Sequence, residues 1–564
     1  MTRKFIIIAG AVILLATLAG GASKHVRRTN SPAGTALYTA ADDIENDYNE
    51  AISTVSVNYA GDIDYERVTQ SAIQGMLATL DPHSAYFSFA EFRKLREDQD
   101  SRFYGIGVTI GQHRDGVYIQ STVDGTPAAR AGLRYGDRIV EVDGKDARSW
   151  DSRQVSKNVR GILGETVNLK IERAGSEAPL YFTIVRDAVP SPTIRDAYMI
   201  RPGTGYIGLT GGFQRSSDKE LRESLDKLKK EGMRQLILDL RGNPGGLLDQ
   251  AIDVSSEFLP RGQVIVSVKG RTEYSDPVVY KSNGSDPEDV PLVVLINRDT
   301  ASASEIVAGA IQDQGRGLIV GETSFGKGLV QRIFQLPGNT GLTLTTARYY
   351  TPYGRSLQRD YSGGSFYDYY VRHDDEPARA QAGATKNRPT PTPPASPAQP
   401  VPTGPAVTTA AGRVFYGGGG ITPDIESRQP PGSLVRNRIA DEAFYFARQL
   451  AAGVVPGFES YRIEKVQYGR SAKASDYPIT DGVVEAFRSF IRARADAGLT
   501  GAQIDAELDF VKLRLRDEIV TAAYGPADGT RILLDSDPQV LRAVEALPDA
   551  KRLAESVRNG TSRG

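Results

Sequence analysis

The sequence predicts a multidomain α/β protein, and three observations carry that prediction. The chain has 564 residues, which is room for three or four domains of ordinary size. Its middle part alternates helical patterns with short apolar runs, namely Leu236–Leu240, Leu292–Ile296 and Leu318–Val320. The regions near the two ends are helical in pattern, because their apolar residues recur every three or four positions.

Residues 1–23 are predicted to be a targeting segment. Basic Arg3 and Lys4 precede the apolar run Phe5–Ala19, and small residues follow it. The run is long for a signal peptide and short for a spanning helix, so a cleaved signal peptide and a retained N-terminal anchor both stay open. We favour export with cleavage. Either outcome places the body outside the cytoplasm, in the periplasm or cell envelope, the alternative being an inner-membrane anchor.

Residues 35–100 are predicted to form an N-terminal helical region. Helical spacing runs as far as Thr79, and the turn Asp81-Pro82-His83-Ser84 ends it. Two interpretations stay open for these helices: a plain cap on the fold, or a surface for association.

An ordered series of glycine-bearing motifs follows in residues 102–190: FYGIGV, GTPAARAGL and GDRIVEVDG. The series resembles a PDZ domain. In such domains, backbone amides of a loop bind the terminal carboxylate of a peptide, which adds to an open sheet edge. The resemblance assigns that loop to Gly105, Ile106, Gly107 and Val108. Val155 and Val159 would line the side-chain pocket, with simple core packing as the alternative.

The most informative stretch is Pro291–Gln331. Its strand-like opening is followed by a turn and then by Ser302 at the start of a helical pattern, where unpaired helix amides could stabilise an oxyanion. Further on, Lys327 stands between two glycines, so backbone can pack closely on it and lower its pKa by excluding water. Taken singly, the serine would be an ordinary N-cap and the lysine an ordinary surface turn.

Together, the motifs SASEIVAGAIQD and GETSFGKGLVQ resemble the core of the carboxyl-terminal processing proteases, the Ser/Lys peptidases of the tail-specific protease family. The resemblance implies that Ser302 is the nucleophile, that Lys327 is its base and that Gln331 supports the lysine. Thr300 stands where the family usually has a first serine. Asp313 matches an acidic position of the motif, and we interpret it as structural.

The same resemblance implies the fold: a crotonase/ClpP-like β-α protease core with an inserted PDZ domain, flanked by N-terminal and C-terminal helical regions. The turn RGNPGG, which follows the apolar run at 236–240, would supply the amide of Gly245 or Gly246 to an oxyanion hole shared with the amide of Ala303. The protease domain would cover 191–376 and resume at 411–430. Between these parts, residues 377–410 are rich in Pro, Ala and Thr and are predicted to be a disordered insert.

Residues 432–564 are predicted to be a C-terminal helical region without a chemical motif. Thr500 and Gln503 form a capping box for a long helix over 504–523, and Pro538 occupies the first position of a last helix.

The composition narrows the chemistry. The net charge of −1 gives no bias toward nucleic acid, and the absence of Cys removes thiol nucleophiles and cysteine-bound metals. The four His (His25, His83, His113 and His373) show no ligand spacing, so we expect neither a metal nor another cofactor. With no His near the core motif in sequence, Lys327 is the leading candidate for the base.

These patterns predict a serine endopeptidase with a Ser/Lys dyad, which cleaves exported proteins at or near their C-termini and whose PDZ domain recognises or gates substrate tails. Expected partners are protein or peptide substrates through their C-termini, an adaptor or activating protein, and further copies of the chain through the helical regions. Two alternatives remain: an inactive PDZ scaffold on a degenerate protease fold, and an acyl-CoA enzyme of the crotonase type. The first predicts loss of Ser302, Lys327 or the glycine turn, and the second does not require Lys327.

Overall fold

The computed structural model describes residues 32–271, 277–361, 404–494 and 496–561. The chain separates into two compact units, residues 1–75 and 76–564. The first unit holds α2 (Pro32–Asn58) and most of α3 (Tyr65–Ala78). The predicted targeting segment, residues 1–23, lies outside the described residues. Within the described part of the chain, no helix has both the length and the hydropathy needed to cross a membrane.

The region predicted to be a PDZ domain forms a sheet of its own, with strand order β3-β4-β5-β7-β8 and β6 paired to β5. Its two ends are held together, because β2 (Arg102–Gly105) pairs antiparallel with β9 (Asp187–Pro190). The chain therefore enters and leaves this domain through two paired strands, as expected for a domain that is inserted into another one. The remaining elements are β3 (Val108–His113), β4 (Gly116–Thr122), α5 (Pro127–Ala131), β5 (Arg138–Val142), β6 (Lys145–Asp146), α6 (Ser152–Val159), β7 (Thr166–Glu172) and β8 (Leu180–Val185).

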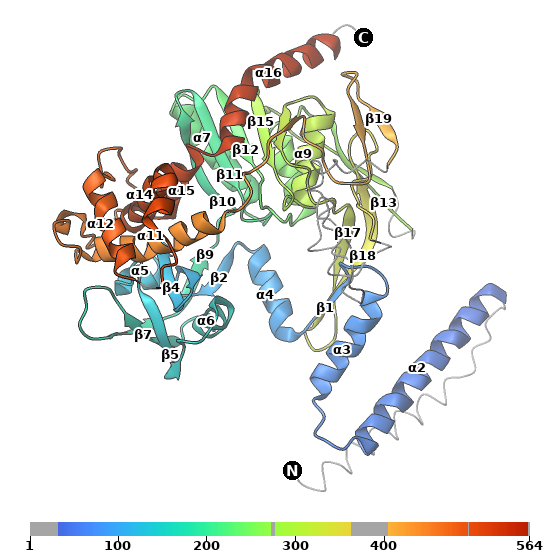
Figure 1. The fold of residues 1–564 in the computed structure, drawn as a ribbon. Coiled ribbons are helices and arrows are strands. Elements are labelled where there is room, and N and C mark those ends of the chain that lie inside the picture. The colour runs from blue at the N-terminus through green and yellow to red at the C-terminus, as the bar shows by residue number, and fades with distance from the viewer. Residues whose placement is uncertain (1–31, 272–276, 362–403, 495, 562–564) are drawn as a thin grey trace, which may run out of the picture. The chain divides into compact units, whose positions relative to one another are not determined.

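A six-stranded sheet of order β10-β11-β12-β15-β16-β21 forms the centre of the second unit (Figure 1). β10 runs antiparallel to β11, and every other neighbouring pair is parallel. Parallel strands are buried on both faces, which explains why they are continuous apolar runs without alternation. The strands are β10 (Ile194–Arg201), β11 (Thr204–Leu209), β12 (Gln235–Asp239), β15 (Leu292–Ile296), β16 (Leu318–Gly321) and β21 (Ile425–Glu426).

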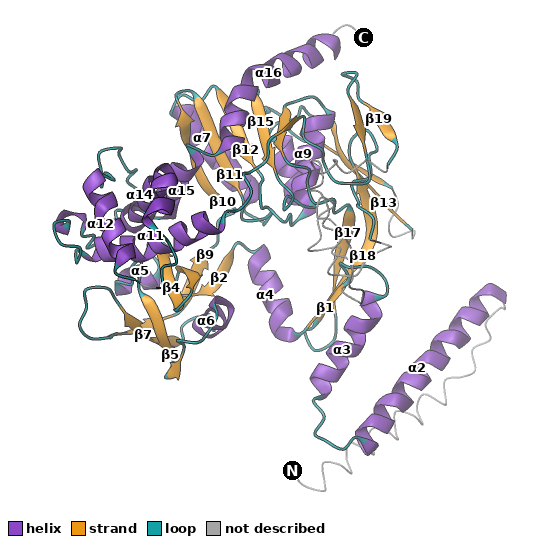
Figure 2. Cartoon of the chain, in the orientation of Figure 1, coloured by secondary structure: helices purple, strands orange, loops and turns teal. Residues whose placement is uncertain are grey.

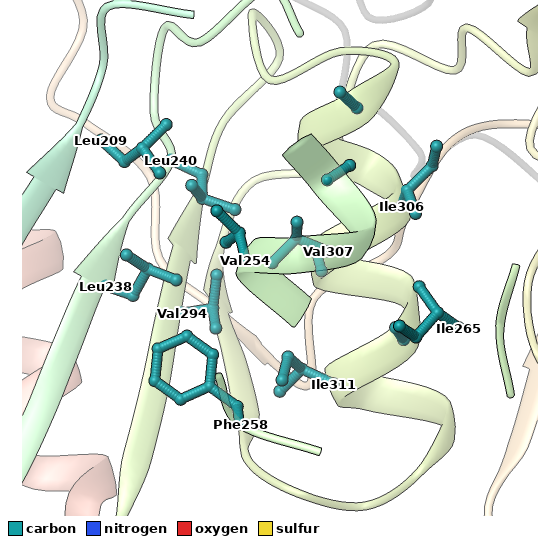
Figure 3. Close-up of a cluster of buried hydrophobic side chains, with 14 of the residues drawn as sticks. Leu209, Leu238, Leu240, Val254, Phe258, Ile265, Val294, Ile306, Val307 and Ile311 are labelled. Atoms are coloured by element: carbon teal, nitrogen blue, oxygen red, sulfur yellow. The ribbon is translucent and has the colours of Figure 1, made fainter. Parts of the chain in front are cut away.

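Helices cover both faces of this sheet. On one face, α7 (Ser217–Lys230), α8 (Leu248–Ser256) and α9 (Ala303–Asp313) pack on the strands, and Figure 3 shows Val254 and Val307 meeting Leu238, Leu240 and Val294. On the other face, α16 (Pro538–Thr561) packs on strand residues through Val540, Ala543 and Leu547. The last helix thus packs on the central sheet. The spacing of its apolar residues could not predict this, because such spacing shows that one face of a helix is buried and not which element covers that face.

A second sheet has the order β1-β18-β13-β14, and β17 pairs with β18 to make a long hairpin. The strands are β1 (Ala85–Phe87), β13 (Val264–Gly270), β14 (Val278–Lys281), β17 (Leu329–Gln335) and β18 (Gly341–Tyr350). β1 was not predicted: it lies in the region assigned to helices, between α3 and α4 (Phe89–Gln99), and its three residues are too few to show a period.

The helices α11 (Leu434–Ala452), α12 (Asp481–Arg492), α13 (Gly501–Ala506), α14 (Leu508–Tyr524) and α15 (Pro526–Leu534) form a bundle, drawn in purple in Figure 2. Its apolar cluster includes Tyr118 of β4 and Tyr135 of the turn before β5. The capping box is confirmed by reciprocal hydrogen bonds between Thr500 and Gln503. The single long helix over 504–523 is wrong, because Glu507 departs from helical dihedral angles and separates α13 from α14.

Of the predicted disordered insert 377–410, residues 377–403 lie outside the described residues. The prediction of disorder is wrong for the rest, residues 404–410. There, β19 (Ala406–Thr408) pairs antiparallel with β20 (Val414–Tyr416). The β-branched Val407 and Thr408 favour a strand, and the turn between them and Arg413 is short enough for a hairpin.

Candidate active site

Ser302 lies between β15 and α9, at the N-cap position of the helix. Its backbone has φ 57° and ψ −115°, a conformation that residues with a side chain rarely adopt. Such strain costs about 1–3 kcal/mol and persists only where the surroundings impose it. A strained serine at a strand-to-helix turn is the local geometry of an activated nucleophile.

The carboxylate of Glu305, one turn into α9, imposes that conformation. It is fully buried and accepts hydrogen bonds from the backbone amides of Ser302 (2.8 Å), Gly326 (2.7 Å) and Lys327 (2.9 Å). A fourth comes from Ser324 Oγ at 2.5 Å. Burial raises the pKa of Glu305, and these hydrogen bonds act against the rise. One side chain therefore connects the serine turn to the lysine loop.

Lys327 lies in the loop between β16 and β17 and not on the strand with Gln331. Gly328 allows the close backbone packing expected from the sequence, since a Cβ at that position would lie 2.7 Å from the Gln358 amide nitrogen. Burial lowers the pKa of Lys327, against the opposing charges of Glu305 and Asp81. Among the described residues, no hydrogen bond joins Lys327 Nζ to Ser302 Oγ.

The glycine turn after β12 packs directly against the serine. A Cβ on Gly245, where φ is +94°, would lie 2.7 Å from Ser302 Cβ and 2.8 Å from the Ala303 amide nitrogen. The turn is fixed by buried Asn243, whose carbonyl oxygen accepts from the Ala301 amide at 3.0 Å and from Ser304 Oγ at 3.1 Å. The close approach of the two segments explains why glycine is needed there.

The backbone amides near Ser302 differ in their availability. The Gly245 amide donates to Asn243 Oδ1 at 2.9 Å. The amides of Ala303 and Gly246 have no hydrogen-bond acceptor in the described part of the chain. Of the two glycines proposed from the sequence, Gly246 therefore has the amide that is free to bind a developing oxyanion.

The other residues of the motif have structural partners. Gln331 donates from Nε2 to Thr345 Oγ1 at 3.2 Å across the hairpin. Asp313 is buried and accepts from Arg355 Nη2, which supports its interpretation as structural. Thr300 Oγ1 donates to the Leu240 carbonyl at 2.9 Å, so it ties the serine turn to the end of β12.

Four residues of this site were not predicted from the sequence: Asn243, Glu305, Asp81 and His83. Glu305 had a signal, because Ser302-x-x-Glu305 is a capping-box pattern. Asp81 and His83 had none, since the turn that carries them lies far from Lys327 in sequence. Yet the pKa of His83 falls to about 4 through burial and the neighbouring charge of Lys327.

The predicted carboxylate-binding loop joins β2 to β3, and β3 is the edge strand of its sheet. The amides of Ile106 and Gly107 have no acceptor among the described residues. Val155 and Val159 are buried within the core of the domain, which favours core packing over a place in the peptide pocket. In the described ranges, no group of His, Asp and Glu side chains has the arrangement of a metal site.

Comparison with known proteins places this geometry in a family. Residues 203–365 match Peptidase family S41, and residues 94–172 match the PDZ domain. A carboxy-terminal-processing protease of Bartonella bacilliformis is 36% identical over 362 residues, which are 64% of this chain and 81% of that protein. The chain belongs to the carboxyl-terminal processing proteases.

Two further relatives agree. A carboxyl-terminal-processing protease of Synechocystis is 36% identical over 52% of this chain and 69% of its own length. Carboxy-terminal processing protease CtpA of Bacillus subtilis is 31% identical over 62% of this chain and 74% of its own length. The resemblance inferred from the motifs is thus confirmed, and this protease is a serine peptidase with a PDZ domain.

Proposed function

We propose that this protease is an endopeptidase in which Ser302 is the nucleophile and Lys327 the general base, and that it cleaves exported proteins at or near their C-termini. The observation that carries the proposal is the Glu305 carboxylate, which binds the backbone amides of both Ser302 and Lys327. The serine turn and the lysine loop are thus fixed to one buried group, which is how a site keeps two reacting side chains in a fixed relative position.

The reaction proceeds in two halves. Ser302 Oγ attacks the carbonyl carbon of the scissile bond while neutral Lys327 Nζ takes the hydroxyl proton. The amides of Ala303 and Gly246 stabilise the oxyanion, at about 3 kcal/mol for each donor. The Lys327 ammonium then protonates the leaving amine, and an acyl-enzyme remains. Water attacks the acyl carbon, Lys327 takes its proton and returns it to Ser302 Oγ, and the carboxylic product leaves.

The base role requires a deprotonated lysine. A free lysine has a pKa of about 10.4, so a working base near neutral pH needs a fall of roughly 3 units. Burial of Lys327 lowers its pKa in the required direction. Gln331 is held on the hairpin by Thr345 and would support the lysine when substrate closes the site. Hydrogen bonds of a catalytic dyad commonly tighten only in the substrate complex.

The PDZ domain would select and gate the substrate. β3 has an unpaired edge within the described residues, and the amides of the preceding loop, Gly105–Val108, would bind the terminal carboxylate of the tail. A tail bound there places the rest of the substrate in reach of Ser302 by raising its local concentration.

The core would be of the crotonase/ClpP type. Residues 1–23 would export the protease to the periplasm or cell envelope, and this segment would then be either cleaved or kept as an inner-membrane anchor.

The helical regions would bind an adaptor or activating protein and would join copies of the chain to one another. Support comes from large apolar side chains that the first unit exposes, namely Ile44, Tyr48, Val55, Val57, Tyr59, Tyr65 and Val68. An Ile44→Asp/Val57→Asp double variant should reduce the mass of the assembly in light scattering.

The catalytic assignment is tested with Ser302→Ala and Lys327→Ala. Each should lower cleavage of an unfolded protein, followed by mass spectrometry, by about 10⁴-fold or more. Ser224→Ala on α7 and Lys281→Ala on β14 are the matched controls and should cleave at the unaltered rate. If Lys327→Ala keeps most of the activity, the dyad is wrong.

A further inference from the structure

Residues 81–99, which join α3 to the PDZ domain, dock along the hairpin β17–β18. β1 pairs with the start of β18. Beyond that pairing, Ser84 Oγ accepts a hydrogen bond from the Thr345 backbone amide at 3.1 Å. The Phe92 ring packs on Gly341 so closely that a Cβ there would lie 2.3 Å from Phe92 Cδ2. Arg96 Nη2 donates a hydrogen bond to Gln335 Oε1 at 2.7 Å. This segment therefore holds the hairpin that begins two residues after Lys327.

The turn Asp81–Ser84 at the head of the segment is internally fixed. Asp81 Oδ1 accepts from the amides of His83 and Ser84, both at 2.8 Å, and Oδ2 accepts from Ser84 Oγ at 2.7 Å. Asp81 is 8% exposed. A carboxylate with three donors inside its own turn has no freedom to swing away, so its charge has a defined place.

Ser84 fixes this turn to β18, and the strand paired with β18, β17, begins two residues after Lys327. Two charges oppose the fall in the pKa of Lys327, Glu305 from α9 and Asp81 from the turn. His83 lies in the same field, since burial, Lys327 and Arg359 lower its pKa while Asp81 raises it, and the result is about 4. The His83 imidazole is neutral at neutral pH, so Asp81 is the charged group that the turn presents to Lys327.

The turn is also linked to Gln331. Ser84 Oγ holds the backbone of Thr345, and Thr345 Oγ1 accepts from Gln331 Nε2 at 3.2 Å. Asp81, Ser84, Thr345 and Gln331 thus form a continuous chain of hydrogen bonds from the turn to β17.

We propose that the turn Asp81–Ser84 is a positioning element of the active site, in which Asp81 sets the charge around Lys327 and Ser84 holds the strand that positions Gln331. The proposal rests on the base role of Lys327 proposed above. It extends the site to a segment that precedes the PDZ domain in sequence. A group that moves this turn would change the protonation of the base without touching the substrate.

The first test is the pH profile of kcat/KM. Its acid limb reports the deprotonation of Lys327 in the free protease. Asp81→Asn removes a negative charge, so the midpoint of this limb should move to lower pH by about half a unit or more. Asp505→Asn, an equal change of net charge on exposed α13, should leave the midpoint in place. A midpoint that stays unchanged or moves upward in Asp81→Asn overturns the proposal, because a merely structural loss lowers the rate without moving the limb.

The second test does not depend on turnover or on the folding of Asp81→Asn. His83 can be titrated by NMR, with its ring signal identified by its loss in His83→Gln. In Lys327→Met the neighbouring positive charge is gone, so the pKa of His83 should rise above about 4. An unchanged pKa would mean that the turn does not face Lys327. This measurement reports whether the charge of Lys327 lies near His83, whether or not Lys327 is the base. Failure of the base role of Lys327 can therefore be distinguished from failure of the positioning role of the turn.

Discussion

Glu305 Oε2 accepts a hydrogen bond from the backbone amide of Lys327 at 2.9 Å, while the same oxygen accepts from the amide of Ser302 at 2.8 Å. The shared acceptor is a buried carboxylate, which is costly to leave unpaired. Movement of the lysine loop away from the serine would therefore break hydrogen bonds to a buried charge. Glu305 therefore fixes the serine turn and the lysine loop to each other.

Glu305→Gln should impair the site even though the side chain keeps its size. An amide has one oxygen, so its NH₂ group would face donors that now point at Oε1, Ser324 Oγ and the Gly326 amide. We expect a fall in kcat of about 100-fold and a loss of about 1–3 kcal/mol in unfolding free energy, since buried donors are left unpaired. Kinetics and chemical denaturation would measure both. Glu257→Gln, at the end of α8, is the control, and equal effects in the two variants would refute a special role for Glu305.

Gly245→Ala should abolish activity by steric means. The added Cβ would lie 2.7 Å from Ser302 Cβ, so the glycine turn or the serine must shift. Gly242→Ala, in the same turn, is the matched control: its φ is also positive, at 67°, but its Cβ would meet nothing within 4 Å. The control should lose only about 1 kcal/mol of stability from backbone strain. Comparable activity in the two variants would show that the turn does not need to touch Ser302.

Recognition of the tail should depend on a free carboxylate. Amidation of the C-terminus of a peptide substrate should raise KM with little change in kcat, because the proposed binding of the loop amides to the terminal carboxylate would be lost. Gly107→Ala should remove this difference, since its Cβ would lie 2.3 Å from Thr126 Cβ and distort the loop. Gly125→Ala, with open space around its Cβ, should retain it. Equal KM values for free and amidated tails in the unaltered protease would refute carboxylate recognition.

His83 should make the protease less stable in mild acid. Its pKa falls from 6.5 to about 4 on folding, so the unfolded chain binds the proton more tightly between these values. Above about pH 6.5 the His83 ring is neutral in both states and does not lower the free energy of unfolding. As the pH falls from 6.5 toward 4, the unfolded chain binds a proton that the folded ring does not bind, so the free energy of unfolding decreases. We expect the unaltered protein to lose about 1–2 kcal/mol more than His83→Gln between pH 7 and pH 5, after allowance for partial exposure. Urea unfolding at the two pH values measures the difference, and identical losses would contradict the shift.

Local patterns were sufficient for the parts of the site that are close in sequence. The settings of Ser302 at a strand-to-helix turn and of Lys327 between glycines could be predicted because turn chemistry and helix starts are local properties, whereas the roles proposed for them came from the resemblance to the family. The buried parallel strands were predicted for the same reason. β1 was missed because its three residues take their structure from β18, a segment far away in the chain. β19 pairs with nearby β20, and it was missed because the composition of the Pro-, Ala- and Thr-rich stretch before it outweighed the local strand signal.

The sequence by itself determined the family, and through the family's motifs it pointed to Ser302 and Lys327 as the candidate nucleophile and base. Only the tertiary structure decided what surrounds the lysine. Glu305 is close to Ser302 in sequence, but its contact with Lys327 depends on how α9 and the loop after β16 pack. Asp81 and His83 precede β1, whose pairing with β18 joins segments far apart in the chain, and the charges of Asp81 and Lys327 act on the pKa values of Lys327 and His83. A pKa is set by burial and by every nearby charge, and these are properties of the folded arrangement that no local pattern encodes.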